Sequence, residues 1–119
     1  MHPILVSSVV LLLLDAVFLK VISTMFRGQI MDVQKAPLKV NYVGAAICYA
    51  FLLFGLYYFI LKPRKPVLDA FLLGLVIYGV YESTSYALLE KWRLSTVAVD
   101  TLWGGTLFAL TTYATYALS

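Results

Sequence analysis

Apolar residues fill four stretches of the chain, residues 3–24, 40–61, 67–89 and 95–118, and most charged residues lie between them. Each stretch reaches the roughly 20 mostly apolar residues that a helix needs to cross a bilayer. Short connections between consecutive spans favour antiparallel neighbours. The pattern therefore predicts an all-α, polytopic integral membrane protein: a single domain over 1–119, built as an antiparallel bundle of four transmembrane helices.

Two connections carry much of the positive charge. The run Lys-Pro-Arg-Lys-Pro at 62–66 ends the second stretch, because proline lacks an amide donor and restricts the residue before it. The longer basic connection over 25–39 allows two interpretations. It is either a short amphipathic piece at the membrane interface or an extension of the first helix.

Composition narrows the class of protein. The 119 residues are 62% hydrophobic, with a mean hydropathy of +0.90, which is too much apolar surface for a soluble domain of this size to bury. The net charge of +3 suits contact with lipid headgroups, and a soluble basic scaffold for nucleic acid is lacking. With one cysteine, Cys48, and one histidine, His2, we expect no internal disulfide, no metal centre and no cofactor.

Charge and aromatic residues suggest how the helices sit in the membrane. The connection at 62–65 holds three basic residues, and the opposite side holds six if Lys20 reaches outward. The positive-inside rule then places the first and third connections in the cytoplasm and both termini outside it. Aromatic residues near helix ends are typical of interfacial belts. We assign Tyr57, Tyr58, Tyr113 and Tyr116 to the belt beside the termini, and Tyr42, Tyr86 and Trp92 to the other belt.

Three carboxylates interrupt the apolar stretches: Asp15, Glu82 and Asp100. A charge in hydrocarbon costs ~2.5–3.5 kcal/mol on insertion scales, so such residues indicate a functional site by default. With a rise of about 1.5 Å per residue, they lie about 18, 22 and 26 Å from the side that holds the termini. We therefore expect three helices to bring their carboxylates together in the half of the membrane opposite the termini.

Other polar residues fall on the same helix faces as these carboxylates. Positions 78, 81, 82 and 85 follow the i, i+3, i+4, i+7 spacing of one face, and positions 100 and 103 share a stripe. Because lipid penalises polar side chains, these faces should point inward. The predicted pocket is lined by Asp15, Tyr78, Tyr81, Glu82, Ser85, Asp100 and Trp103.

Each carboxylate also allows a structural interpretation. Asp15 could fasten two helices through a hydrogen bond, and such bonds average ~0.6 kcal/mol in membrane proteins. Asp100 could lie close enough to the interface to be hydrated. Glu82 is hardest to explain in this way, because it lies deeper and has polar neighbours. Carboxylates that share a low dielectric cannot all ionise cheaply, so we expect Glu82 to be protonated or the pocket to hold a cationic guest.

Three runs carry a family resemblance: Leu-Asp-Ala-Val-Phe-Leu at 14–19, Gly-Val-Tyr-Glu-Ser-Thr-Ser at 79–85 and Asp-Thr-Leu-Trp-Gly at 100–104. With Tyr49, Phe54-Gly55 and Trp92, they make the chain resemble the predicted membrane proteins of domain-of-unknown-function family 2177. In that family pattern the acid of the second run is usually Asp followed by Leu-Thr-Asn, whereas this chain has Glu-Ser-Thr-Ser at 82–85. The resemblance extends over nearly the whole chain and implies four helices, without implying an activity.

Two functions remain open on this reading. The first is a channel-like or transporter-like protein whose carboxylate-lined pocket binds or translocates a proton, a cation or a small amphipathic ligand. One protomer offers little room for an aqueous path, so we expect a homo-oligomer in the lipid bilayer. The alternative is a structural or assembly protein whose polar residues lock helices together. We expect no enzyme, because no nucleophile and base are paired and no span contains a histidine.

Overall fold

The computed structural model describes residues 2–34, 42–89 and 92–119, without the side chains of residues 23–27, 29, 30 and 32–34. Over these residues it contains helices and turns and no strand, which confirms the all-α prediction. The elements are α1 (Pro3–Gln34), α2 (Tyr42–Leu56), the π-helical turn η1 (Tyr57–Leu61), α3 (Val67–Leu88) and α4 (Leu94–Leu118).

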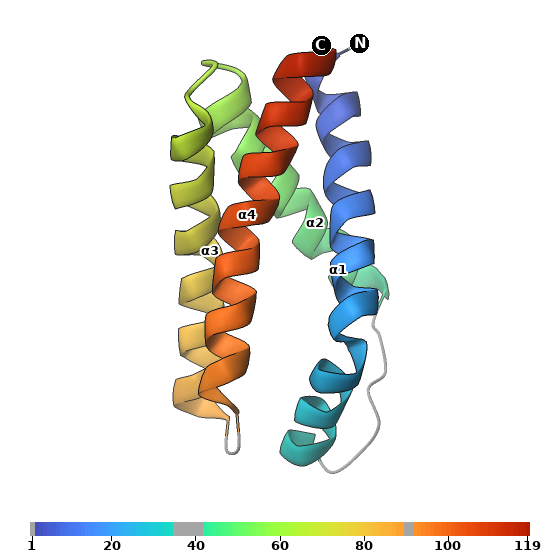
Figure 1. Ribbon diagram of the computed structural model, residues 1–119, viewed down its shortest axis with the longest axis vertical. Coiled ribbons are helices and arrows are strands. Elements are labelled where there is room, and N and C mark those ends of the chain that lie inside the picture. The colour runs from blue at the N-terminus through green and yellow to red at the C-terminus, as the bar shows by residue number, and fades with distance from the viewer. Residues whose placement is uncertain (1, 35–41, 90–91) are drawn as a thin grey trace.

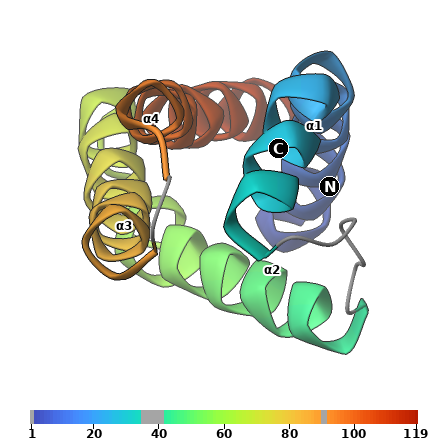
Figure 2. The same ribbon diagram turned by 90° about the horizontal axis from the view of Figure 1, so that it is seen from below.

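The helices alternate in direction along a body of 45 × 23 × 22 Å, and both termini lie at one end (Figure 1). Seen along the long axis, α4 lies between α3 and α1, and α2 closes the remaining side (Figure 2). The most extensive packing joins α4 to α3, and α4 also packs against α1. Helix α2 crosses at an angle and packs less closely against the others.

The first helix is longer than its apolar pattern predicts. It continues from the expected end at position 24 to Gln34, so most of the basic connection extends the helix. The apolar stretch ends near Ile22, but the following residues contain neither proline nor a strong turn signal before Pro37. Residues 35–41, and the side chains that would make this segment amphipathic, lie outside the description.

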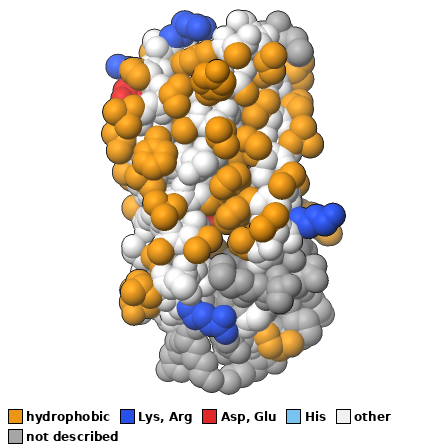
Figure 3. Space-filling model, viewed as in Figure 1, with side chains coloured by type: hydrophobic (Ala, Val, Ile, Leu, Met, Phe, Trp, Pro, Cys, Tyr) orange, Lys and Arg blue, Asp and Glu red, His pale blue; other side chains and the backbone are white. Residues whose placement is uncertain are grey.

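Among the described residues, three helical segments are long and apolar enough to cross a membrane. They are Pro3–Ile22, Tyr42–Leu61 and Val67–Leu88, with mean hydropathies of 2.4, 2.0 and 1.4. Large apolar side chains on them face outward; Phe51, for example, is 72% exposed and Leu88 is 76% exposed. Hydrophobic side chains cover much of the face shown in Figure 3, with Lys and Arg at its upper end and in its lower half. An apolar exterior of this kind is typical of a surface in contact with lipid.

Glycines bring α3 and α4 into close contact. A Cβ atom on Gly74 would collide with the backbone carbonyl of Gly104, and one on Gly104 would collide with the Tyr78 ring. Small residues at such a crossing allow two backbones to approach, which is a common way to pack helices in membranes. This contact fixes the two helices that carry Glu82 and Asp100.

The half of the body nearer the termini holds a cluster of buried apolar side chains, beside the buried hydroxyl residues Ser7, Thr111, Thr112 and Thr115. We call this cluster the apolar core; its buried members are Leu11, Leu52, Leu56, Ile60, Leu61, Ala70, Leu107 and Phe108. The turn after η1 closes it, with Arg64 in the left-handed backbone region at φ 57°. The Tyr116 hydroxyl donates to the Lys65 carbonyl at 2.6 Å, and the Arg64 guanidinium lies 4.5 Å from the centre of the Tyr116 ring. Tyr116 thus anchors the end of α4 to this turn.

Candidate functional site

Asp15 joins three helices through its two oxygens. It lies on α1, is 6% exposed, and accepts hydrogen bonds from the Tyr49 hydroxyl of α2 and the Trp103 indole of α4. Tyr49 donates to Oδ2, and Trp103 Nε1 donates to Oδ1 over 2.9 Å. Each oxygen therefore has a donor that replaces water, as a buried carboxylate requires.

The Trp103 ring is positioned by a second contact with α1. It stacks on Phe18, with 4.4 Å between the ring centres and only 4° between the planes. Phe18 comes three residues after Asp15, so both side chains lie on the same face of α1. The stacked ring directs the indole N–H toward the carboxylate, which makes the α1–α4 contact specific.

Glu82 on α3 is buried completely, with 0% exposure. Its Oε2 accepts a hydrogen bond from Trp92 Nε1 at 2.9 Å, and its Oε1 has no partner in the described structure. Trp92 precedes α4 and is only 6% exposed. Its assignment to an interfacial belt is therefore wrong: the indole is drawn inward because it is the donor to a buried carboxyl group.

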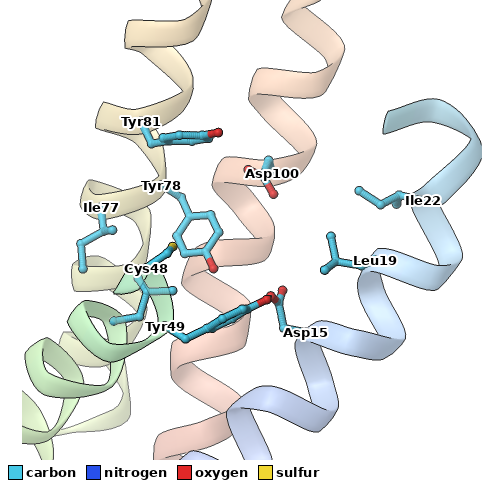
Figure 4. Close-up of a pocket in the computed structure, with 10 residues that line it drawn as sticks. Asp15, Leu19, Ile22, Cys48, Tyr49, Ile77, Tyr78, Tyr81 and Asp100 are labelled. Atoms are coloured by element: carbon cyan, nitrogen blue, oxygen red, sulfur yellow. The ribbon is translucent and has the colours of Figure 1, made fainter. Parts of the chain in front are cut away.

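A cavity of about 400 Å³ is lined by residues of all four helices, in the half of the body opposite the apolar core. Figure 4 shows Tyr49 and Tyr78 pointing toward Asp15, and Tyr81 pointing toward the helix that carries Asp100. We call it the polar cavity. The residues that line it are Asp15, Leu19, Ile22, Cys48, Tyr49, Leu52, Ile77, Tyr78, Tyr81 and Asp100.

Asp100 connects the two other carboxylates. It lines the polar cavity together with Asp15, and its carboxyl group lies within electrostatic range of both Glu82 and Asp15. The described residues of the cavity wall include no lysine or arginine. The site thus brings acidic groups together in the protein interior, and no described residue of the cavity wall supplies a positive charge to neutralise them. Such an arrangement favours protonation of the carboxylates or binding of a cation.

The structure separates the residues predicted from the sequence into three groups. Asp15, Tyr78, Tyr81 and Asp100 line the polar cavity, and Trp103 supports Asp15 from behind. Glu82 is not among the lining residues; it accepts a hydrogen bond from Trp92 and lies beside Asp100, which does line the cavity. Ser85 is half-buried and is not part of the lining.

Sequence reasoning missed two partners of the carboxylates, Tyr49 and Trp92. Tyr49 follows Cys48 in an apolar stretch that contains no charged residue, so α2 was not expected to contribute to the site. A signal was available, however. Tyr49 lies twelve residues before the expected end of its helix and Asp15 twelve residues after the start of its own, which places both about 18 Å from the same side.

Three described helices that are long and apolar enough to cross a membrane, with acidic residues buried between the helices, are the features of a helical membrane protein. Residues 1–117 match the family described as "Predicted membrane protein (DUF2177)", and the chain belongs to this family. Comparison with curated proteins and with solved structures gives no match.

Proposed function

We propose that this protein spans the membrane with four helices and binds a proton or a cationic guest in the polar cavity. The fourth span is supported by the packing of α4. Its 25 residues extend about 37 Å, and it lies along α3, so a bilayer surrounding α3 also surrounds α4. Its threonines and glycines lower its hydropathy, but these residues are largely buried against other helices.

The observation that carries the proposal is the charge of the cavity wall. Asp15 and Asp100 line it, Glu82 lies immediately behind Asp100, and no described wall residue is basic. Acidic groups in such surroundings are stabilised by protons or by a cation. Asp15 is held by donors from two other helices, whereas the side-chain hydrogen bond of Asp100 is to Glu82, another acidic group. Asp100 is therefore the residue we assign to direct contact with the guest.

The apolar core limits what one protomer can do. It lies in the half of the body nearer the termini, together with buried threonines of α4, and of its buried members only Leu52 lines the polar cavity, so the cavity does not extend through it. Binding needs only the cavity, whereas translocation needs a path past this core. We therefore propose that any transport activity involves a homo-oligomer.

Cys48 provides a direct test, because the only cysteine of the chain lies on the cavity wall with an accessible side chain. The purified protein would be treated with cationic 2-aminoethyl and anionic 2-sulfonatoethyl methanethiosulfonate. We expect the cationic reagent to react at least about tenfold faster relative to each reagent's rate with free thiol, because it is attracted by the acidic wall.

The variants make this test specific. Asp100→Asn should reduce the rate ratio toward one, and Asp69→Asn should leave it unchanged because Asp69 lies in the first turn of α3, outside the cavity wall. Equal rates for both reagents in the unmodified protein would contradict a cation-binding cavity.

A structural function is the second candidate, favoured by the hydrogen bonds that join α1, α2 and α4 at Asp15. Under it, Asp15→Asn lowers stability and Asp100→Asn changes neither stability nor charge preference.

The orientation in the membrane is a separate proposal: we propose that both termini are non-cytoplasmic, following the positive-inside rule. Reporter fusions at each end should both show activity outside the cytoplasm.

A further inference from the structure

We infer that the guest is a small organic ammonium ion with a short apolar group, held between Asp15, Asp100 and three tyrosine rings. This inference rests on the proposed function and narrows it. The alternatives within that function are a proton and an inorganic cation. The size, wall composition and donor chemistry of the polar cavity distinguish among them.

The volume of the cavity is larger than a proton or a bare metal ion requires. At about 400 Å³ it falls at the lower end of the ~300–1,000 Å³ that ligand pockets occupy. A small organic molecule fits in this space, which a proton or a bare metal ion would leave almost empty. A proton could be held by the Glu82–Asp100 pair alone, for which a cavity is unnecessary.

The wall is divided between polar and apolar side chains, as an amphipathic guest would require. Leu19 and Ile22 of α1 lie beyond Asp15 in Figure 4, and Ile77 flanks the tyrosines of α3. Asp15 and Asp100 supply negative charge between these apolar surfaces. The arrangement fits a charged head beside the carboxylates and an apolar group against the aliphatic side chains.

Three aromatic rings strengthen the case for an organic cation. Tyr49, Tyr78 and Tyr81 come from two helices and contribute to the same wall as the two aspartates. Aromatic faces attract ammonium groups by cation–π interactions, worth about 0.5–2 kcal/mol each depending on desolvation. Strongly hydrated metal ions prefer a shell of oxygen ligands instead.

The donor set is also poor for a metal ion. In the parts of the chain that the structure describes, no group of three or more Asp, Glu, His or Cys residues is arranged to hold one. The two oxygens of Asp15 already accept hydrogen bonds from Tyr49 and Trp103. One remaining carboxylate and two tyrosine hydroxyls give a weak site for a divalent ion but an adequate one for an ammonium group.

Protection of Cys48 measures this preference without any substitution. The rate at which neutral methyl methanethiosulfonate modifies Cys48 would be measured at increasing concentrations of benzyltrimethylammonium. The same measurement would be made with its neutral carbon analogue, (2,2-dimethylpropyl)benzene, at equal free concentration. Two further series would use Na⁺ and Mg²⁺. We expect benzyltrimethylammonium to protect at a concentration at least tenfold lower than its neutral analogue, and we expect no protection by either inorganic ion.

Variants then identify the contacts. Asp100→Asn should weaken protection tenfold or more, and Asp69→Asn should not change it. Tyr81→Leu should weaken it about 2- to 30-fold, while Tyr81→Phe, which keeps the ring, should change it less than twofold. Circular dichroism would confirm that each variant is folded, and the comparison of the two organic probes stands without them.

The failures of the two proposals differ. Equal protection of Cys48 by the neutral analogue would overturn the assignment of an ammonium guest. Protection by Na⁺ or Mg²⁺ alone would overturn it as well. Either outcome would still leave the cavity as a binding site. If no probe protects Cys48 and the charged methanethiosulfonates also react at equal rates, the ammonium guest and the proposed function are both overturned.

Discussion

The apolar core and the polar cavity share the same helices but are built in opposite ways. In the core, α1 contributes Leu11 with no exposed surface; one turn further along, the same face contributes Asp15 to the cavity. In the core the space is filled by aliphatic and aromatic side chains, whereas in the cavity about 400 Å³ is left open. Leu52 borders both regions.

This contrast suggests that the apolar core supplies stability and the polar cavity supplies charge selectivity. Close packing fixes the relative positions of the helices, because interiors at crystal-like density do not deform easily. The cavity can then hold its carboxylates apart from one another without collapsing. If this view is correct, substitutions in the core should change stability and leave charge selectivity intact, and substitutions in the cavity should do the reverse.

Leu11→Ala should give the largest loss of stability. Leu11 is fully buried, and Leu→Ala substitutions at such positions cost about 2–5 kcal/mol through lost contacts and the space that remains. Unfolding in mixed detergent micelles, followed by circular dichroism, measures it. The control is Leu13→Ala, since Leu13 is 63% exposed and should lose less than about 0.5 kcal/mol. A change in the charge preference at Cys48 would show that the two regions are not separable.

Gly74→Val tests the close approach of α3 and α4. Added side-chain atoms meet the backbone of Gly104, which cannot move aside as a side chain could, so we expect a loss near the upper end of ~1–3 kcal/mol. Gly79→Ala on the same helix is the matched control, because its Cβ would meet only Thr101 at an ordinary 3.6 Å. Similar losses for both variants would indicate a general effect on α3 rather than a collision.

Apolar periodicity and length were enough to predict the helices, because lipid exposure imposes long apolar runs on any spanning segment. The run that follows Ile22 is polar and contains no helix stop signal, so the continuation of α1 to Gln34 could not be decided from composition. The depth of Asp15, Glu82 and Asp100 followed from the rise of a helix alone. That arithmetic placed the three carboxylates near one another, and the structure brings Asp100 within range of both others.

Hydrogen-bond partners were harder to predict than depth. Depth does not state which way a helix is rotated or which donor a carboxyl group meets: Glu82, which was expected in a common pocket with Asp100, lies beside Asp100 and accepts a hydrogen bond from Trp92. Tryptophan at a helix end is typical of an interfacial belt, and nothing local in the sequence distinguishes a belt residue from a donor to a buried acid. The cavity is lined by side chains from all four helices, so it is a feature of packing that no single stretch encodes.

Trp92→Phe should have a smaller effect than the core substitutions and should act through Glu82. Phenylalanine keeps most of the buried ring but removes the indole donor to Oε2 of a fully buried carboxyl group, whose Oε1 has no described partner. An unsatisfied buried group costs about 1–3 kcal/mol. The same unfolding assay measures it, and Glu82→Gln in the Trp92→Phe background provides a double-mutant cycle. If the two losses simply add, the hydrogen bond contributes nothing.

Trp103→Phe should have the smallest effect, because Asp15 has two donors and keeps one of them. Phenylalanine can still stack on Phe18, and Tyr49 still donates to Oδ2, so only the bond to Oδ1 is lost. Side-chain hydrogen bonds between membrane helices average ~0.6 kcal/mol, and we expect a loss of that size. Tyr49→Phe should cost about as much, while Tyr49→Phe with Trp103→Phe should cost clearly more than the sum, because Asp15 then has neither donor. A sum without excess would mean that water entering the polar cavity can replace both donors, and Asp15 would then belong to the guest site as directly as Asp100.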